Sequence, residues 1–234
     1  MAVYLYDELT RQLVTRMTSN GIKLNGHTNR VFCTKWLPED PNVCITGGWD
    51  RIMKVYDTRV GKPVAQILGP LVAGDAIDIG GDEILAGSNR HQNPLAIYSL
   101  SMGKVIQEIP FDPPHMSYDQ SGYVMCCRFS KDRDRSIIFA GGAGRNELRA
   151  YDNDTVGIGS FKQIGSINEN RSPILCMDTA TNGLQMAWGN HMGHIYISNY
   201  DLHAVDEEPD IRTVMGRVQA RRQAQAQQAA AAAQ

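Results

Sequence analysis

The sequence has little net charge, few cysteines and no long apolar run, and each scarcity excludes a class of protein. Lysine and arginine number 23 and aspartate and glutamate number 25, which leaves a formal net charge of −2 over 234 residues. So nearly neutral a chain offers no overall field to attract nucleic acid or an anionic membrane surface. Hydrophobic residues make up 42% of the chain and charged residues 21%, which excludes wholesale disorder.

No apolar segment approaches the ~18–20 residues that a membrane-spanning helix needs. The N-terminal segment MAVYLYDELTRQLVTRM carries charges at Asp7, Glu8 and Arg11, where a secretory signal would be apolar. The five cysteines are odd in number and irregularly spaced, which does not fit a disulfide framework. The sequence therefore predicts a cytoplasmic protein in a reducing compartment.

The composition divides the chain into two parts near residue 205. Residues 1–205 are rich in glycine and in β-branched and aromatic residues, and their short apolar runs alternate with turn residues, as in an all-β domain. Residues 206–234 contain no aromatic residue and end in alanine and glutamine. Acidic residues followed by an apolar stripe at helical spacing predict a C-terminal α-helical tail here.

Four segments of the first part share one pattern: an apolar residue, a small residue, glycine or a substitute for it, a polar turn and an alternating strand. The closing strands recur at intervals of 50, 42, 53 and 47 residues, measured between Tyr6, Tyr56, Tyr98, Tyr151 and Ser198. Helical repeats of this length would show helical spacing instead of alternation. The period is slightly longer than the ~40–45 residues of a propeller blade, so it predicts blades with loop insertions.

The best-marked blade predicts strands at 31–37, 43–48, 52–57 and 63–68, with PEDPN (38–42) as a turn. The same pattern divides the first part into a partial blade and four further units, of which the last has a poorly marked fourth strand. These units lie at residues 1–17, 22–69, 73–109, 123–167 and 174–205.

This blade resembles a WD40 repeat. Gly26-His27 is followed by Tyr56-Asp57, which is similar to the Gly-His and Trp-Asp signature of that repeat, with tyrosine in place of tryptophan. The stretch GHTNRVFCTKWLPEDPNVCITGGWDRIMKVYDTRVGKPV resembles the family throughout, and GPLVAGDAIDI with NPLAIYSLSMGKVIQEI is similar to protist WD-repeat scaffold proteins. The resemblance implies an all-β, WD40-type β-propeller, partial at about four to five blades.

The resemblance also implies a structural hydrogen-bond network. In WD40 blades a histidine, a hydroxyl residue, an aspartate and the closing tryptophan form a hydrogen-bonded chain, and the matching positions here are His27, Thr46, Asp50 and Tyr56. Tyr56 departs from the pattern because a phenol is a different donor from an indole N–H. The other blades carry alanine at the Thr46 position (Ala86, Ala140 and Ala187), so we expect them to rely on packing.

Other reactive-looking motifs favour structural interpretations. Cys126 and Cys127 are adjacent on a strand and face opposite ways, and His191 and His194 lie in a turn without further metal-ligating residues at matching spacing. The glycine-rich run at 140–146 lacks the following helix of a phosphate loop, and KDRDR (131–135) is interpreted as a solvated loop. We therefore predict no catalytic residue, no metal and no cofactor.

Two segments are candidates for partner contact. The insertion at 110–123 is too long for a simple connection and carries Phe111, Tyr118 and Tyr123, while a plain insertion is the alternative. In the tail, the apolar stripe is suited to docking on a partner or on the propeller, and a frayed appendage is the alternative. The stripe consists of Ile211, Val214, Met215 and Val218.

The resemblance implies a non-catalytic scaffold that mediates protein–protein interaction in a larger assembly, cytoskeletal or in a cilium axoneme by analogy with similar protist proteins. The alternatives are a substrate-receptor or accessory subunit of an enzyme complex, or an RNA-associated scaffold.

The number of predicted blades falls short of the roughly seven of many WD40 rings. The strand at residues 3–7 also matches the third strand of a blade whose first two strands are missing. Three explanations stay open: a chain whose N-terminal blades are missing, a partner chain that completes the propeller, or a small ring closed by the hairpin at 1–17.

Overall fold

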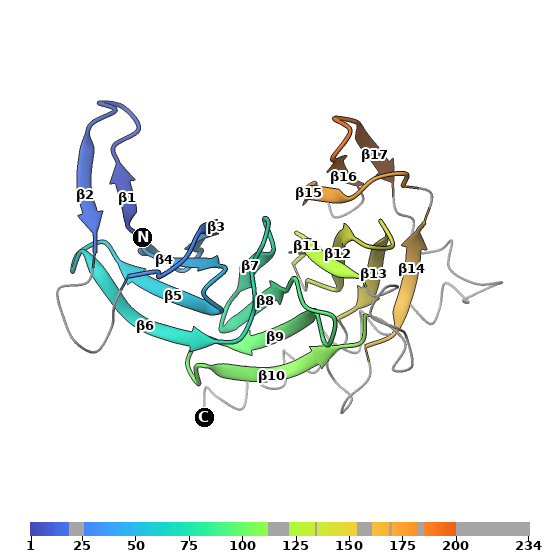
Figure 1. The fold of residues 1–234 in the computed structure, drawn as a ribbon, viewed down its shortest axis with the longest axis horizontal. Coiled ribbons are helices and arrows are strands. Elements are labelled where there is room, and N and C mark those ends of the chain that lie inside the picture. Colours follow the sequence, from blue (N-terminus) through green and yellow to red (C-terminus); the bar gives the residue numbers. More distant parts are fainter. Residues whose placement is uncertain are drawn as a thin grey trace, which may run out of the picture. The chain divides into compact units, whose positions relative to one another are not determined.

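The structure is a computed structural model that describes residues 1–18, 26–111, 122–133, 135–153, 161–168, 170–181 and 185–199. These residues form antiparallel β-sheets and contain no helix, which confirms the predicted all-β class (Figure 1). No helix long and apolar enough to cross a membrane is therefore found in this described part of the chain. The predicted helical tail at 206–234 lies outside the described residues.

Four sheets, each a meander of consecutive strands, form the four blades of a propeller. Blade 1 contains β3 (Val31–Leu37), β4 (Asp40–Gly48), β5 (Ile52–Asp57) and β6 (Lys62–Leu68). Blade 2 contains β7 (Ile77–Gly80), β8 (Glu83–Gly87), β9 (Leu95–Ser99) and β10 (Lys104–Ile109). Blade 3 contains β11 (Tyr123–Phe129), β12 (Ile137–Ala143), β13 (Leu148–Asp152) and β14 (Gln163–Ile167). Blade 4 has three described strands, β15 (Ile174–Thr179), β16 (Gln185–Asn190) and β17 (Ile195–Asn199).

The middle strands are apolar on both faces because each inner blade packs between two others. Every residue of β9 is buried, whereas the outer strand β10 is mostly exposed. The inner strands contact one another in chain order, β3 with β7, β7 with β11 and β11 with β15. Strands buried on both faces need near-continuous apolar sequence, which explains runs such as LAIYS.

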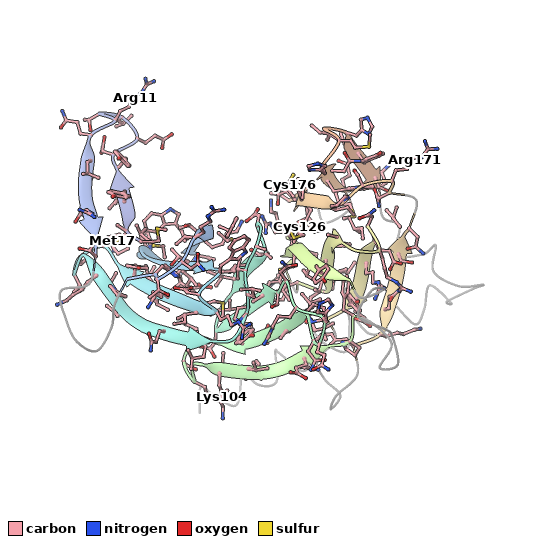
Figure 2. The ribbon with its side chains drawn as sticks, in the orientation of Figure 1. Arg11, Met17, Lys104, Cys126, Arg171 and Cys176 are labelled. Carbon is pink, nitrogen blue, oxygen red and sulfur yellow. The ribbon has the colours of Figure 1, made fainter. Side chains whose placement is uncertain are left out.

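The adjacent cysteines of β11 show this packing at one position. Both side chains are fully buried, and they point to opposite neighbours as the alternation predicts. The Cys126 thiol lies 4.0 Å from the carbonyl oxygen of Ile174 in blade 4, and the Cys127 thiol lies 3.9 Å from that of Leu85 in blade 2. Figure 2 shows Cys126 beside the exposed Cys176 of β15. These cysteines therefore act as small apolar residues between blades.

The hairpin β1 (Val3–Tyr6) and β2 (Leu13–Met17) forms a separate two-stranded sheet. Met17 packs with Cys44 and Tyr56 of blade 1, and Val3 and Leu5 lie against the same cluster. The hairpin therefore covers the middle strands of blade 1 on one side.

One predicted turn is shorter than expected. Strand β4 begins at Asp40, so the turn after β3 contains only Pro38 and Glu39 instead of the whole PEDPN segment. Leu37 pairs with Asp40 across this turn, next to an irregularity in the ladder. The Asp40 carboxylate accepts the main-chain N–H of Asn42 at 2.9 Å and an Arg59 N–H at 3.0 Å, and these local bonds hold a polar segment in the strand.

Candidate functional site

A buried polar network joins the loop before β3 to strand β4 in blade 1. The His27 ring lies 2.8 Å from Asp50 through Nδ1 and 2.6 Å from the Thr46 hydroxyl through Nε2. The same Asp50 oxygen, Oδ2, accepts the main-chain N–H of Thr28 at 3.1 Å. Burial lowers the pKa of His27 although Asp50 opposes the shift, so the ring is neutral at pH 7. A neutral ring donates its Nδ1–H to Asp50 and accepts the Thr46 hydroxyl proton.

Tyr56 lies next to this network without joining its chain of hydrogen bonds. Its ring is fully buried, 6.4 Å from the His27 ring, and its hydroxyl forms no side-chain hydrogen bond of good geometry among the described residues. Burial, with Cys44 and Asp50 nearby, raises the pKa of Tyr56 to about 12, and the His27 main chain only partly offsets this. The phenol therefore fills the position by packing, whereas an indole would present its N–H at a different place.

The corresponding positions in the other blades are apolar. Ala86 and Ala140 are buried opposite Ile77 and Cys127, and Ala187 lies opposite Asp178. These alanines offer no hydroxyl to a histidine, so the His27–Asp50–Thr46 arrangement belongs to blade 1.

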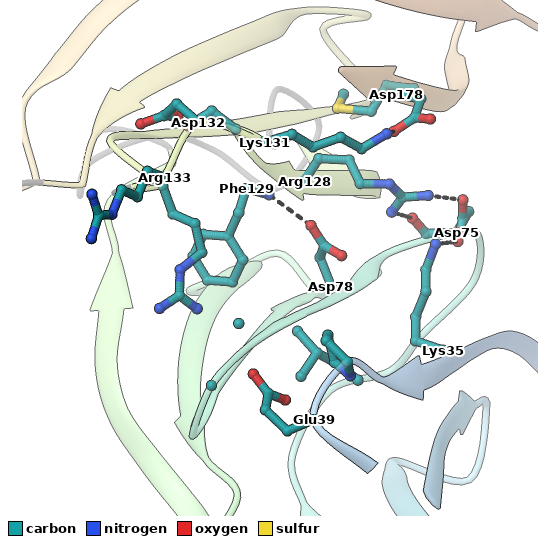
Figure 3. A pocket seen from close by; sticks show the side chains of 17 residues that line it. Lys35, Glu39, Asp75, Asp78, Arg128, Phe129, Lys131, Asp132, Arg133 and Asp178 are labelled. Atoms are coloured by element: carbon teal, nitrogen blue, oxygen red, sulfur yellow. Dashed lines mark hydrogen bonds and ion pairs between the residues drawn. The ribbon is translucent and has the colours of Figure 1, made fainter. Parts of the chain in front are cut away.

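A cavity of about 870 Å³ opens where the inner strands of all four blades turn into their second strands (Figure 3). Blade 1 contributes the Pro38–Glu39 turn, blade 2 the end of β7 with Gly80 and Gly81, and blade 4 Met177 and Asp178. The loop between β11 and β12 forms the wall from blade 3. Its described lining residues are Ser130, Lys131, Asp132, Arg133 and Arg135.

Ion pairs between blades lie along this cavity. Asp75, just before β7, pairs with Arg128 of β11, and its other oxygen lies 3.2 Å from Nζ of Lys35 in β3. Arg128 is almost fully buried and also donates to the carbonyl oxygens of Asp75 and Cys127, at 3.1 and 2.7 Å. Burial alone would raise the pKa of Asp75, but Arg128 and Lys35 hold that pKa below its usual value. One carboxylate therefore connects blades 1, 2 and 3.

Blade 4 is connected to blade 3 in the same way. Nζ of Lys131 lies 2.8 Å from the Asp178 carboxylate, although both side chains are substantially exposed. Asp78 of β7 accepts the main-chain N–H of Phe129 at 2.8 Å, and burial raises the pKa of this carboxyl group. The ion pair contributes little because water screens it, whereas Asp78 of blade 2 satisfies a main-chain donor of blade 3.

The sequence carries a signal for these residues that belongs to none of the motifs described above. Each inner strand carries a charged residue in an otherwise apolar run: Lys35, Asp78, Arg128 and Asp178. The segment at 131–135 is also more than the predicted solvated loop, because its described residues line the cavity. Sequence alone could not show this, since the charges become neighbours only when four blades stand side by side.

The predicted partner contacts have different outcomes. Phe111 is 4% exposed and packs in the core, with the Arg149 guanidinium 4.4 Å from its ring centroid, so the prediction of an exposed contact is wrong here. Tyr123 begins β11, is half-buried, and places its hydroxyl 3.1 Å from Nε2 of His91. Tyr118, Ile211, Val214, Met215 and Val218 lie outside the described residues.

The chemistry available at these positions is electrostatic. Burial raises the pKa of the Cys33 thiol to about 12 and that of Cys44 to about 11, which keeps both in the unreactive thiol form. Within the described ranges, no three His, Cys, Asp or Glu side chains are grouped so as to hold a metal ion. The His27 network is enclosed within blade 1, so it is suited to fastening strands.

Part of this chain is similar in sequence to known WD-repeat proteins. Residues 19–57 match the family described as WD domain, G-beta repeat. Human striatin-3 is 31% identical over 110 residues, and the match covers 45% of this chain and 13% of striatin-3; striatin-3 from Rattus norvegicus is 30% identical over the same length. The chain thus spans a small part of the relatives it matches.

Among solved structures, a chain from the crystal structure of the mitotic checkpoint complex superposes with a TM-score of 0.66 at 14% identity. The superposition covers 86% of this chain and 59% of the other. One segment of the chain therefore matches a WD40 repeat, and its propeller of four blades is similar in fold to the WD40 propeller proteins.

Proposed function

We propose that this chain is a non-catalytic scaffold that mediates protein–protein interaction within a larger assembly. WD40 propellers generally serve as interaction platforms, and the striatin-3 match supports the same class. The observation that carries the proposal is the apolar surface on blades 1 and 4. Phe32 and Trp36 of β3 are 40% and 48% exposed, and Ile195 and Ile197 of β17 are 77% and 75% exposed. Apolar groups gathered on a strand face or edge mark interaction sites.

We further propose that a partner chain completes the propeller at these blades. Within the described residues, the inner strand β3 packs against β7 of blade 2, and the β1–β2 hairpin packs on Cys44 and Tyr56 of the middle strands of blade 1. Strands from a partner would cover Phe32 and Trp36, as β7 covers the opposite face of β3. A cytoplasmic, cytoskeletal or axonemal assembly belongs to the same proposal by analogy.

The test is assembly of the full chain with and without these apolar groups. We expect the wild-type chain to copurify with a defined partner in constant ratio, and Trp36→Ser with Ile197→Ser to lose that partner while keeping the β-sheet circular dichroism spectrum. Val60→Ser, which replaces a half-exposed residue in the β5–β6 turn, serves as the control. A wild-type chain that is monomeric, unfolds cooperatively and retains no partner would contradict the proposal.

The tail provides a second test. Deleting residues 206–234 should leave the β-domain folded and weaken assembly, because the stripe at Ile211, Val214, Met215 and Val218 suits a partner groove. Equal partner recovery by the truncated chain would remove the tail from the proposal. A substrate-receptor role in an enzyme complex, or an RNA-associated role, would be recognised by the identity of the copurified partner.

A further inference from the structure

We infer that the cavity between the inner strands binds an acidic segment of a partner protein, with Arg135 as the residue that takes a carboxylate. The inference rests on the proposed scaffold function and names the chemistry of the partner. The cavity wall contains five basic and five acidic side chains.

Most of the acidic side chains are already engaged. Asp75 pairs with Arg128 and Lys35, and Asp178 pairs with Lys131. Asp78 accepts the Phe129 main-chain N–H at 2.8 Å. Asp132 accepts the Ser136 main-chain N–H at 3.1 Å, a bond internal to its own loop. Only Glu39, which comes from the exposed turn of blade 1, has no such bond within the described residues.

The basic side chains are less completely engaged. Lys35, Arg128 and Lys131 lie in the ion pairs between blades, whereas Arg133 is exposed and in no ion pair of the described residues. Nη1 of Arg135 is buried and donates to no described acceptor. The residue as a whole is only partly buried and lines the cavity, so its guanidinium combines an unsatisfied donor with surface that an incoming oxyanion can reach.

The loop holds the Arg135 main chain in place for this task. Its φ of 49° lies in the left-handed region, which is uncommon for a residue with a side chain. The conformation is fixed at both ends, because the Arg135 N–H donates to the Asp132 carbonyl at 3.1 Å and the Arg135 carbonyl accepts the Asn153 side-chain amide at 2.8 Å. Such constrained conformations are concentrated at functional sites.

Two neighbours hold the Arg135 side chain over the cavity. The guanidinium carbon lies 5.7 Å from the centre of the Phe129 ring, and the guanidinium rests against the Gly80–Gly81 turn of blade 2. A Cβ at position 80 would collide with Nη1, so only glycine leaves room for this arrangement. Phe129, Ile79 and Met177 add apolar surface beside the charge. A volume of about 870 Å³ is large for a single ion and suits a few residues of a peptide.

The test measures the dissociation constants of defined probes for the full chain by calorimetry at low salt. The probes are an acetylated hexapeptide of alternating leucine and glutamate, its leucine–glutamine counterpart, and inorganic phosphate. We expect the glutamate peptide to bind best, and Arg135→Gln to weaken it at least about tenfold, the loss of one charged hydrogen bond. Arg135→Lys should fall between the two, because lysine keeps the charge and loses the planar fork.

Two further variants distinguish binding at the Arg135 site from attraction to any positive charge on the protein. Arg11→Gln, which replaces an exposed arginine in the β1–β2 hairpin outside the cavity, should leave the affinity unchanged. Gly80→Ala should weaken binding, because the added methyl group displaces the Arg135 guanidinium. The melting temperature of this variant shows whether it remains folded. If it does not fold, Arg135→Gln alone decides the test.

Equal binding of the glutamate and glutamine peptides, or unchanged affinity in Arg135→Gln, would overturn the inference. Phosphate binding as tight as the glutamate peptide would assign a small-anion site and overturn the peptide assignment. The scaffold proposal fails separately: a partner that still copurifies with Arg135→Gln contradicts this site alone, whereas a wild-type chain without any partner contradicts the function.

Discussion

Blade 1 and blade 3 are both four-stranded meanders, but they fasten their strands differently. Blade 1 places His27, Thr46 and Asp50 in one buried hydrogen-bonded chain. Blade 3 has Ala140 where blade 1 has Thr46, and its inner strand is held by buried apolar packing on both faces and by Arg128 at the cavity. The comparison shows that one repeat unit can tolerate loss of its polar network when neighbours on both sides exclude water.

The largest loss of stability is expected from a substitution in the apolar packing that holds blade 3 against blade 2. Leu85 of β8 is fully buried in the core between blades 2 and 3. Leu85→Ala should lower the free energy of unfolding by about 3 kcal/mol, because it removes buried methyl groups and leaves a cavity. Urea denaturation measures the loss, with the exposed Leu9→Ala as a control expected to change little. A loss below about 1 kcal/mol would mean that blades 2 and 3 do not depend on this apolar packing.

The next largest loss of stability is expected from substitutions in the buried polar network of blade 1. Asp50→Ala removes the acceptor for both the His27 ring and the Thr28 N–H, so it should cost about 2–3 kcal/mol. His27→Ala should cost a similar amount, and the double variant should cost less than the two single effects added together. Unfolding in urea measures all three. Strict additivity, or an unchanged melting temperature in either single variant, would show that the network does not stabilise blade 1.

The pH dependence separates the blades further. The folded-state pKa of His27 is below its ordinary value of 6.5, mainly because of burial, so the unfolded chain binds the proton more readily. The contribution of neutral His27 to the free energy of unfolding is therefore fully present above pH 6.5. It falls as the pH drops through 6.5 and levels off below the lowered pKa of the folded state. Melting temperatures between pH 7.5 and 5 should decline less in His27→Gln than in the wild type. Parallel curves for the two proteins would assign the decline to other groups.

The smallest effect is expected at Tyr56. Tyr56→Phe removes a buried hydroxyl that has no good side-chain hydrogen bond among the described residues, so stability should stay within about 0.5 kcal/mol of the wild type. Tyr56→Ala should cost several times more, because the buried ring fills space against Cys44 and Met17. Thermal unfolding of both variants checks this difference. A large loss of stability in Tyr56→Phe would mean that the Tyr56 hydroxyl takes part in the hydrogen-bond network.

The degree of predictability differs between fold and site for physical reasons. Alternating apolar residues and recurring glycines predicted the strands of blades 1 to 4 because these patterns reflect local backbone preferences and burial. The turn at Pro38–Glu39 came out shorter because side-chain bonds at Asp40 extend β4, and no periodicity encodes such bonds. Phe111 was misjudged because a loop residue can turn inward when a neighbouring blade offers Arg149 and a core to pack on.

By itself the sequence determined the all-β class and the repeat, since these features depend on residues within one blade, whereas the set of His27, Thr46 and Asp50 was implied by the resemblance to WD40 repeats. Only the tertiary structure decided which charges meet. Asp75 and Arg128 are 53 residues apart, and Arg135 reaches Gly80 from a different blade. Contacts between blades depend on the relative placement of whole sheets, and that placement is fixed by packing across many residues at once. The cavity and the guanidinium nitrogen that has no acceptor among the described residues therefore belong to the assembled propeller and to no single repeat.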